Sequence, residues 1–324
     1  MVTTIDLEKK FTGAMKSIAR RADLKSYIEQ TPVMYQLLQR AATKYVAGDN
    51  RQAGLYVGGK LTDKGYPISI EYIGENTTNV QSCEAALLEM KQLIQDLEEL
   101  RMTAARVSFD LSHIGLSVDE EFAFKQLSSL AEQAQLAGIE LFISMEESTK
   151  TEAILSIYKR AVAIYPNIGI TLQAQLHLTA HYSSNLDANP SRIRLVKGAY
   201  QEPEQLALSR SEALNERYLQ LLEQFIEKDH YVSIATHDEL IIDEVIKRGW
   251  AQKSCVEFEM LYGIRPDLSS KLKKEGYPVR IYITYGHEWY LYLCHRIAEY
   301  PPNLYQAFID IASDEPVDSV KDYE

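Results

Sequence analysis

Short apolar or β-branched runs alternate with longer amphipathic stretches from Tyr66 onward. Eight of these runs have the length of a strand, and they cover residues 67–73, 105–111, 139–145, 168–172, 193–196, 231–235, 256–260 and 279–284. Each gap between them can hold a helix, most clearly residues 81–100, 119–137, 202–227 and 238–247. Alternating β and α units specify a parallel sheet covered by helices, and eight strands predict an α/β fold of the (β/α)8 TIM-like barrel type.

A doubly wound open sheet is the alternative architecture. It usually carries a Gly-x-Gly-x-x-Gly turn after its first strand, where this chain has Ile73-Gly74-Glu75-Asn76 instead. Ahead of the barrel, apolar residues such as Val33, Leu37 and Leu38 recur at helical spacing. We therefore expect a helical N-terminal segment over residues 1–60, a barrel over 61–313, and an acidic tail over 314–324 that frays.

The overall charge limits the class of partner. The 324 residues carry a net charge of −12, which repels a phosphate backbone and argues against a nucleic-acid partner. Cys83, Cys255 and Cys294 form no Cys-x-x-Cys pair, and His177 and His181 lack the carboxylate of a His-Glu-x-x-His motif. We expect no disulfide framework and no metal site. No apolar run has the length of a signal peptide or a membrane span, so a cytoplasmic protein is expected, with peripheral contact at the inner face of the membrane left open.

The site of a barrel enzyme is built where the strands end, and these ends are polar here. The most informative segment is Arg194-Leu195-Val196-Lys197-Gly198-Ala199-Tyr200. It offers two cations, a glycine that allows close approach to the backbone, and an aromatic ring, a set that suits a phosphate-bearing ligand. Simpler interpretations exist for neighbouring residues, since Asp238 has the position of a helix N-cap and Lys197 that of a solvated lysine at the barrel rim.

This segment resembles the fifth-strand motif of the proline dehydrogenase family. Further resemblances follow in the same order along the chain, in Leu172-Gln173-Ala174, Ala235-Thr236-His237-Asp238, Glu257-Phe258-Glu259-Met260-Leu261-Tyr262-Gly263, Val279-Arg280-Ile281-Tyr282 with Tyr285-Gly286, and the helix from Tyr292 to Glu299. The resemblance runs from about Tyr66 to Leu304.

The resemblance implies a FAD-dependent oxidoreductase acting on CH–NH donors. It would oxidise L-proline to 1-pyrroline-5-carboxylate by hydride transfer to flavin N5 and pass electrons to a quinone-type acceptor. By resemblance, the cofactor-binding residues are Gln173, Arg194, Val196, Lys197, Gly198, Thr236, His237, Asp238 and Glu299. The substrate-binding residues are Asp110, Ser144, Tyr200, Leu261, Tyr282, Tyr292, His295 and Arg296. Arg194, Tyr282, Arg296 and Glu299 are the expected catalytic residues.

Three of these positions depart from the family pattern. Asp110 stands where the family has a lysine, Ser144 where it has an aspartate, and His295 where it has the first of two arginines. Arg296 remains as the evident partner for a substrate carboxylate. Replacing an opposite charge by a like charge about 4 Å away costs on the order of several kcal/mol at an effective dielectric near 20. We therefore predict that Asp110 pairs with a protonated His295.

Three functions are compatible with this pattern. The first is oxidation of L-proline or a proline-like amine with a remodelled carboxylate site. The second is oxidation of a different cyclic or secondary amine that suits Asp110, Ser144 and His295. The third is a non-catalytic barrel that binds flavin or a metabolite, which predicts a bound flavin that no amine reduces. The polar rim that includes Arg194, Lys197, Tyr282 and Arg296 favours catalysis, because a scaffold would not need it.

Overall fold

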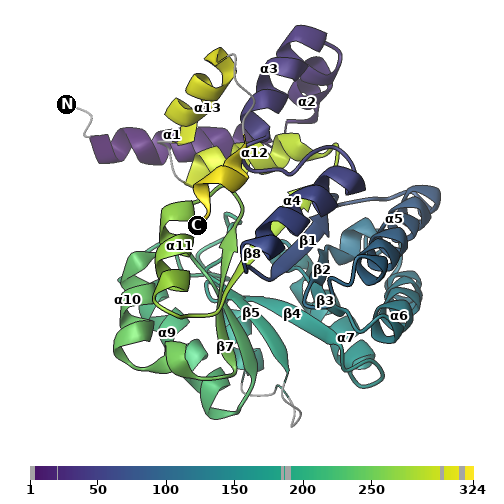
Figure 1. The fold of residues 1–324 in the computed structure, drawn as a ribbon, viewed down its shortest axis with the longest axis vertical. Helices are drawn as coiled ribbons and strands as arrows, with labels where there is room; N and C mark the ends of the chain where they lie inside the picture. The colour runs from purple at the N-terminus through teal and green to yellow at the C-terminus, as the bar shows by residue number, and fades with distance from the viewer. Residues whose placement is uncertain (1–3, 20, 184–185, 187–190, 300–302, 314–317) are drawn as a thin grey trace.

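Eight parallel strands close into a barrel in the order β1 to β8, which confirms the predicted fold class (Figure 1). The structure is a computed structural model that describes residues 4–19, 21–183, 186, 191–299, 303–313 and 318–324. The strands are β1 Ile68–Tyr72, β2 Arg106–Phe109, β3 Glu140–Ile143, β4 Ile168–Gln173, β5 Arg192–Val196, β6 Tyr231–Ala235, β7 Val256–Leu261 and β8 Val279–Tyr285. Every one of them overlaps a run expected from the sequence.

Helices cover the outside of the barrel. They are α4 Arg51–Asp63, α5 Val80–Glu99, α6 Glu120–Leu136, α7 Ser148–Val162, α8 His177–Ser183, α9 Glu212–Glu227, α10 Glu239–Lys247 and α11 Pro266–Lys274, with short 3₁₀ turns at Leu111–His113 and Trp250–Gln252. The helix expected to begin at residue 202 begins ten residues later. Ser211 is its N-cap, and the preceding chain crosses back to form an isolated bridge between Leu176 and Ala207.

The strands have two chemically different faces. Residues such as Val107, Leu195 and Phe258 alternate with polar ones and form the apolar core beneath the helices. The alternate positions point into the barrel, where most TIM barrels hold branched apolar side chains. Here Arg106 and Arg280 both bond Glu257 near the lower end, and Arg194 bonds Glu259 one layer higher. The interior is therefore a network of ion pairs that leads up to the ends of the strands.

A second helical unit lies at one end of the barrel (Figure 1). We call it the N-terminal layer; it consists of α1 Thr4–Ala19, α2 Ala22–Glu29, α3 Pro32–Ala42, α12 Trp289–Glu299 and α13 Asn303–Ala312. It has its own apolar cluster, separate from the barrel core. Trp289 Nε1 donates to Tyr35 Oη at 3.2 Å, and Thr12 Oγ1 donates to the Ala298 carbonyl at 3.1 Å. The N-terminal helices thus support α12, which carries several predicted site residues.

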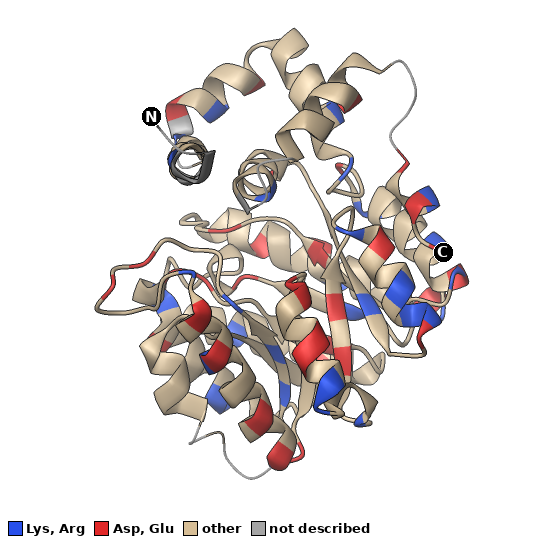
Figure 2. Cartoon of the chain, turned by 90° about the vertical axis from the view of Figure 1, so that its left-hand side faces the viewer, with Lys and Arg blue, Asp and Glu red and all other residues tan. Residues whose placement is uncertain are grey.

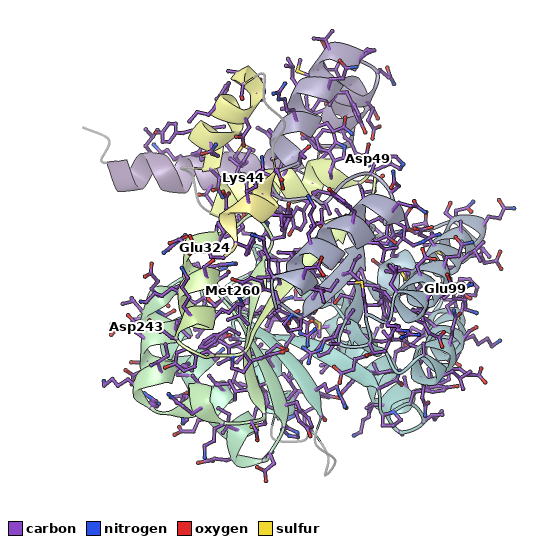
Figure 3. The ribbon with its side chains drawn as sticks, in the orientation of Figure 1. Lys44, Asp49, Glu99, Asp243, Met260 and Glu324 are labelled. Atoms are coloured by element: carbon purple, nitrogen blue, oxygen red, sulfur yellow. The ribbon has the colours of Figure 1, made fainter. Side chains whose placement is uncertain are left out.

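The boundaries of the units differ from those expected. Residue 60 lies inside α4, and α4 packs against β1 and β8 of the barrel. The expected tail does not fray over residues 318–324, because Tyr323 is fully buried and Ser319–Asp322 forms a 3₁₀ turn. Figure 3 shows Lys44 where the N-terminal layer meets the barrel and Glu324 beside the barrel wall. Residues 314–317 lie outside the described part of the chain. No described helix is both long and apolar enough to cross a membrane.

Candidate active site

The predicted site residues converge on the mouth of the barrel, where the strands end. Gln173, Val196 and Leu261 are the last residues of β4, β5 and β7. Asp110 and Ser144 follow β2 and β3 directly. Helix α12 brings Tyr292, His295 and Arg296 to the same end, since Arg296 lies close enough to Glu71 and His237 to influence the pKa of both.

Arg194 forms the floor of the mouth. Its guanidinium donates to both carboxylate oxygens of Glu259, at 2.8 and 2.7 Å, and to Ser108 Oγ at 2.9 Å. It lies 4.8 Å from the ring centre of Phe142 and 4.7 Å from that of Tyr282. Burial opposes ionisation of Glu259, yet the charge of Arg194 lowers the pKa of this carboxyl to about 2. The pair is therefore fully ionised at neutral pH, and Arg194 keeps its positive charge beneath the mouth.

Tyr282 connects this floor to a carboxylate above it. Its hydroxyl donates to Glu71 on the adjacent strand β1. Burial raises the pKa of Glu71, with the hydrogen bond from Tyr282 and the charge of Arg194 acting in the opposite direction. Burial and the neighbouring Glu71 together raise the pKa of the Tyr282 phenol, so this side chain stays a hydrogen-bond donor.

Four acidic residues, Glu71, Glu75, Asp110 and Glu146, surround the mouth, and we call them the mouth carboxylates. Burial, followed by the charges of Glu146, Glu71 and Glu75, raises the pKa of Asp110 well above its usual value. Burial and nearby acidic groups raise the pKa of Glu75 to about 7. Glu146 accepts bonds from the Ser112 amide at 3.0 Å and from Lys150 Nζ at 2.6 Å. Asp110 makes no side-chain cap bond to the turn that follows it. The mouth is thus more acidic than a carboxylate-binding site requires.

Gln173 is held in one orientation by its neighbours. Its Nε2 donates to the Glu146 carbonyl at 2.8 Å, and its Oε1 accepts from Gln175 Nε2 at 2.9 Å. Gln175 Nε2 also lies 3.2 Å from the Tyr200 carbonyl. Gly198 has a φ of +114°, and a Cβ there would collide with the Gln175 side chain. The glycine of the fifth-strand motif is therefore required by this side chain as well as by any ligand that approaches the backbone.

Lys197 and Asp238 are bonded to each other, and Asp238 also caps a helix. Lys197 Nζ donates to Asn215 Oδ1 at 2.6 Å and to Asp238 Oδ2. Asp238 Oδ1 accepts from the Leu240 amide at 3.0 Å, so it is also the N-cap of α10. Thr236 Oγ1 accepts from the Asp238 amide at 3.2 Å. Lys197 is buried rather than solvated, which makes the rim interpretation of this lysine wrong.

His237 is a neutral acceptor at the mouth. Its Nε2 accepts from the Leu261 amide at 3.1 Å. Burial and the charge of Arg296 lower the pKa of His237 to about 3. A neutral imidazole at this position can orient β7 and still use its other nitrogen as a donor.

Helix α12 supplies the remaining predicted residues. The buried Arg296 guanidinium lies 4.8 Å from the Tyr292 ring centre, one helical turn away. The His295 ring meets the Tyr200 ring edge to face at 6.5 Å. Pairing of Asp110 with His295 stays a prediction. Glu299 ends α12, and its side chain lies outside the described part of the chain.

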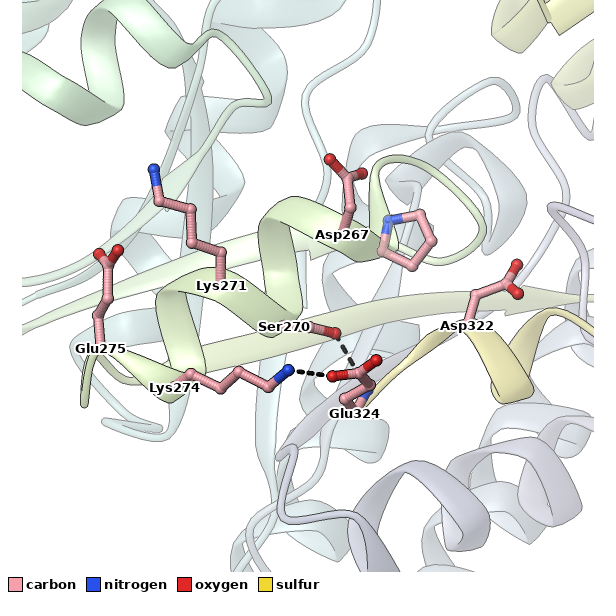
Figure 4. Close-up of a pocket in the computed structure, with 8 residues that line it drawn as sticks. Asp267, Ser270, Lys271, Lys274, Glu275, Asp322 and Glu324 are labelled. Carbon is pink, nitrogen blue, oxygen red and sulfur yellow. Dashed lines mark hydrogen bonds and ion pairs between the residues drawn. The ribbon is translucent and has the colours of Figure 1, made fainter.

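Some partners of the site were not predicted. These are Lys150, Gln175, Asn215 and Glu259. Glu259 could have been found, because it has the same alternation along β7 as the interior-facing Glu257 and Leu261. The others come from loops or helices, whose approach to the mouth depends on the tertiary fold. A cavity of about 580 Å³ beside α11 and Glu324 is lined by none of the predicted site residues (Figure 4).

Comparison with known proteins gives consistent results. The family model described as proline dehydrogenase matches residues 57–303, more than half of the chain. Proline dehydrogenase 2 of Bacillus subtilis (strain 168) is 30% identical over 271 residues, which cover 83% of this chain and 89% of that protein. Proline dehydrogenase of Deinococcus radiodurans is 30% identical over 305 residues, covering 92% and 96%.

A solved structure shows the same fold. Proline utilization A from Bdellovibrio bacteriovorus, inactivated by N-propargylglycine, superimposes with a TM-score of 0.73 at 18% sequence identity. The match covers 86% of this chain and 36% of that one, so the chain spans about a third of the length of this larger protein.

Proposed function

Because this chain belongs to the proline dehydrogenase family, we propose that it oxidises L-proline to 1-pyrroline-5-carboxylate with FAD as its cofactor. One observation carries the proposal: residues from the ends of several strands and from α12, which resemble the family motifs, converge on one mouth above a buried, fully ionised Arg194. Such a cation can stabilise the negative charge that develops on the hydride acceptor of an oxidoreductase acting on CH–NH donors.

The donors at the mouth fit a flavin. His237 has a second ring nitrogen, and Lys197 and Arg296 are cationic. Besides its 2.8 Å bond to the Glu146 carbonyl, Gln173 Nε2 makes a long 3.5 Å contact with the Met145 carbonyl, which a ligand acceptor could replace. A bound FAD would supply the acceptor for the hydride that leaves the carbon next to the substrate nitrogen. Arg194 would stabilise the resulting negative charge, and Tyr282, Tyr292 and Leu261 would exclude water.

The first test is an anaerobic visible spectrum of the purified protein before and after addition of L-proline. We expect an oxidised flavin band that bleaches with L-proline. A purified protein without the band would reject the cofactor. A band that no amine bleaches would support a non-catalytic flavin-binding barrel.

The mouth carboxylates favour a second substrate class. Lys150 is paired with Glu146 and Glu147, and Arg194 with Glu259, so both cations already have carboxylate partners within the protein. A cyclic or secondary amine without a carboxylate would avoid repulsion by Asp110. Flavin that bleaches with pyrrolidine but persists with L-proline would support this alternative.

The finer proposal for electron transfer is a quinone-type acceptor reached by peripheral contact with a membrane. Residues 1–46 contain eight Lys and Arg and four Asp and Glu, a net charge of +4 in a chain of −12. Figure 2 shows few acidic positions in the N-terminal layer and many around the barrel. On α13, Tyr305, Phe308 and Ile309 share one face and are 72%, 64% and 60% exposed. Cationic and apolar groups together suit an anionic lipid surface.

This contact predicts co-sedimentation with vesicles that contain phosphatidylglycerol, and release at high salt because the attraction is screened. Phe308→Asp should weaken binding severalfold. Leu136→Asp is the matched control, since Leu136 is 84% exposed on α6 of the barrel. Equal binding by both variants would contradict the assignment of this face.

A further inference from the structure

Residues 318–324, the C-terminal segment, are packed against the loop that follows β7. The Tyr323 ring stacks on Tyr262 with ring centres 6.1 Å apart and planes at 6°, and it meets Tyr66 edge to face at 5.7 Å. The segment is fastened at its end as well, because the Glu324 amide donates to Ser270 Oγ at 3.0 Å and Tyr66 Oη donates to the Glu324 carbonyl at 2.9 Å. Figure 4 shows Ser270 on α11 directed towards Glu324.

Tyr323 also holds the backbone of this loop. Its hydroxyl oxygen accepts from the Gly263 amide at 2.9 Å. Gly263 has a φ of +74°, and a Cβ there would collide with the Lys44 carbonyl. Ser319 Oγ donates to that same Lys44 carbonyl at 3.0 Å. The loop is therefore enclosed between the C-terminal segment and the chain that enters the barrel from the N-terminal layer.

Three successive amides, from the last residue of β7 into the loop, bond to three different parts of the chain. Leu261 donates to His237 Nε2, two residues after the end of β6, and Tyr262 donates to the Tyr282 carbonyl of β8 at 2.8 Å. Gly263 is the third, and its partner is Tyr323. The first two partners belong to the mouth itself. The third lies outside it, so the C-terminal segment sets how far the loop can move away from the mouth.

We propose that Tyr323 is a positioning residue for the substrate wall: its hydroxyl fixes the Gly263 amide and thereby the place of Leu261 at the mouth. The inference rests on the proposed function, because Leu261 is a wall residue only if the mouth binds an amine substrate. Tyr323 itself does not touch the mouth, and its effect on catalysis passes through the backbone of residues 261–263.

The test is Tyr323→Phe, which keeps both ring contacts and removes one hydrogen bond. One net hydrogen bond corresponds to an equilibrium change of about 2- to 10-fold. We expect amide exchange at Gly263, followed by NMR in the flavin-loaded protein, to accelerate by this factor. The KM for L-proline should rise by a similar factor while kcat stays within about twofold, because the wall moves and the reacting groups do not.

Tyr285→Phe is the control for loss of a buried phenol hydroxyl. Tyr285 is fully buried on the outer face of β8, and its hydroxyl donates to Glu89 on α5 at 3.0 Å. This variant should leave Gly263 exchange and KM unchanged. Unchanged exchange in Tyr323→Phe would overturn the positioning role, and faster exchange with an unchanged KM would overturn its link to the substrate. Wild-type protein that does not oxidise L-proline would instead reject the proposed function, and the exchange measurement would still decide whether Tyr323 holds the loop.

Discussion

Arg194→Met should lower the free energy of unfolding by about 3–5 kcal/mol, as expected when one partner of a buried ion pair is removed. The Glu259 carboxylate would stay in the barrel interior, where it also accepts from Ser69 Oγ but would lose both of its bonds to Arg194. Urea unfolding at pH 7 with linear extrapolation measures the change. L-proline should not reduce the flavin of this variant, because the cation at the floor of the mouth is gone.

The double variant Arg194→Met/Glu259→Met separates stability from chemistry. Removing both charges leaves no uncompensated ion, so most of the lost stability should return while flavin reduction should not. Arg160→Met is the control at an exposed pair, since Arg160 bonds Glu121 on the surface. Its free energy of unfolding should not differ measurably from that of the wild type. A double variant as unstable as Arg194→Met would show that the ion pair is not the source of the loss.

The barrel could be predicted because its strands have a short-range signature. Each strand is a run of four to seven residues whose apolar members are packed beneath helices, and this pattern is visible without any partner. Boundaries were less accurate where long-range contacts decide them. Residues 202–211 have the composition of a helix start, but the bridge between Leu176 and Ala207 holds part of this chain in an extended path.

Which residues form the site could also be predicted, but the hydrogen bonds between them could not. Gln173 and Leu261 end their strands and Asp110 directly follows β2, so their convergence follows from the closed barrel. The bond between Ser69 and Glu259 joins residues 190 positions apart, and sequence patterns carry no information on such pairs. The same limit applies to Tyr323, whose burial depends on contacts with Tyr66 and Tyr262.

Asp110→Asn should lower the KM for L-proline by about tenfold or more at a pH above the raised pKa of Asp110, because a like charge about 4 Å from the substrate carboxylate costs several kcal/mol. The pKa of Asp110 is raised, so wild-type protein should bind L-proline better as the pH falls through that pKa and the carboxyl becomes protonated. The variant should lack this pH response. Measurement of KM for L-proline between pH 5.5 and about 9 in both proteins tests the prediction.

The free energy of unfolding should also depend on the protonation of Asp110. A raised pKa means that the folded state binds the Asp110 proton more tightly than the unfolded state does. Stability from this group is therefore greatest below the ordinary aspartate pKa and declines as the pH rises towards the folded value. Asp110→Asn should remove that decline and be more stable than wild type at neutral pH.

Pyrrolidine, an amine without a carboxylate, distinguishes a charge effect of Asp110 from general damage to the site. Its ammonium form is attracted by Asp110, so Asp110→Asn should raise the KM for pyrrolidine while lowering the KM for L-proline. Glu147→Gln is a suitable control, because Glu147 is bonded to Lys150 at the edge of the mouth and should alter both constants less. KM values that change in the same direction for both amines would place Asp110 away from the substrate carboxylate. Opposite shifts would identify Asp110 as the residue that sets the preference of this mouth between an amino acid and a simple amine.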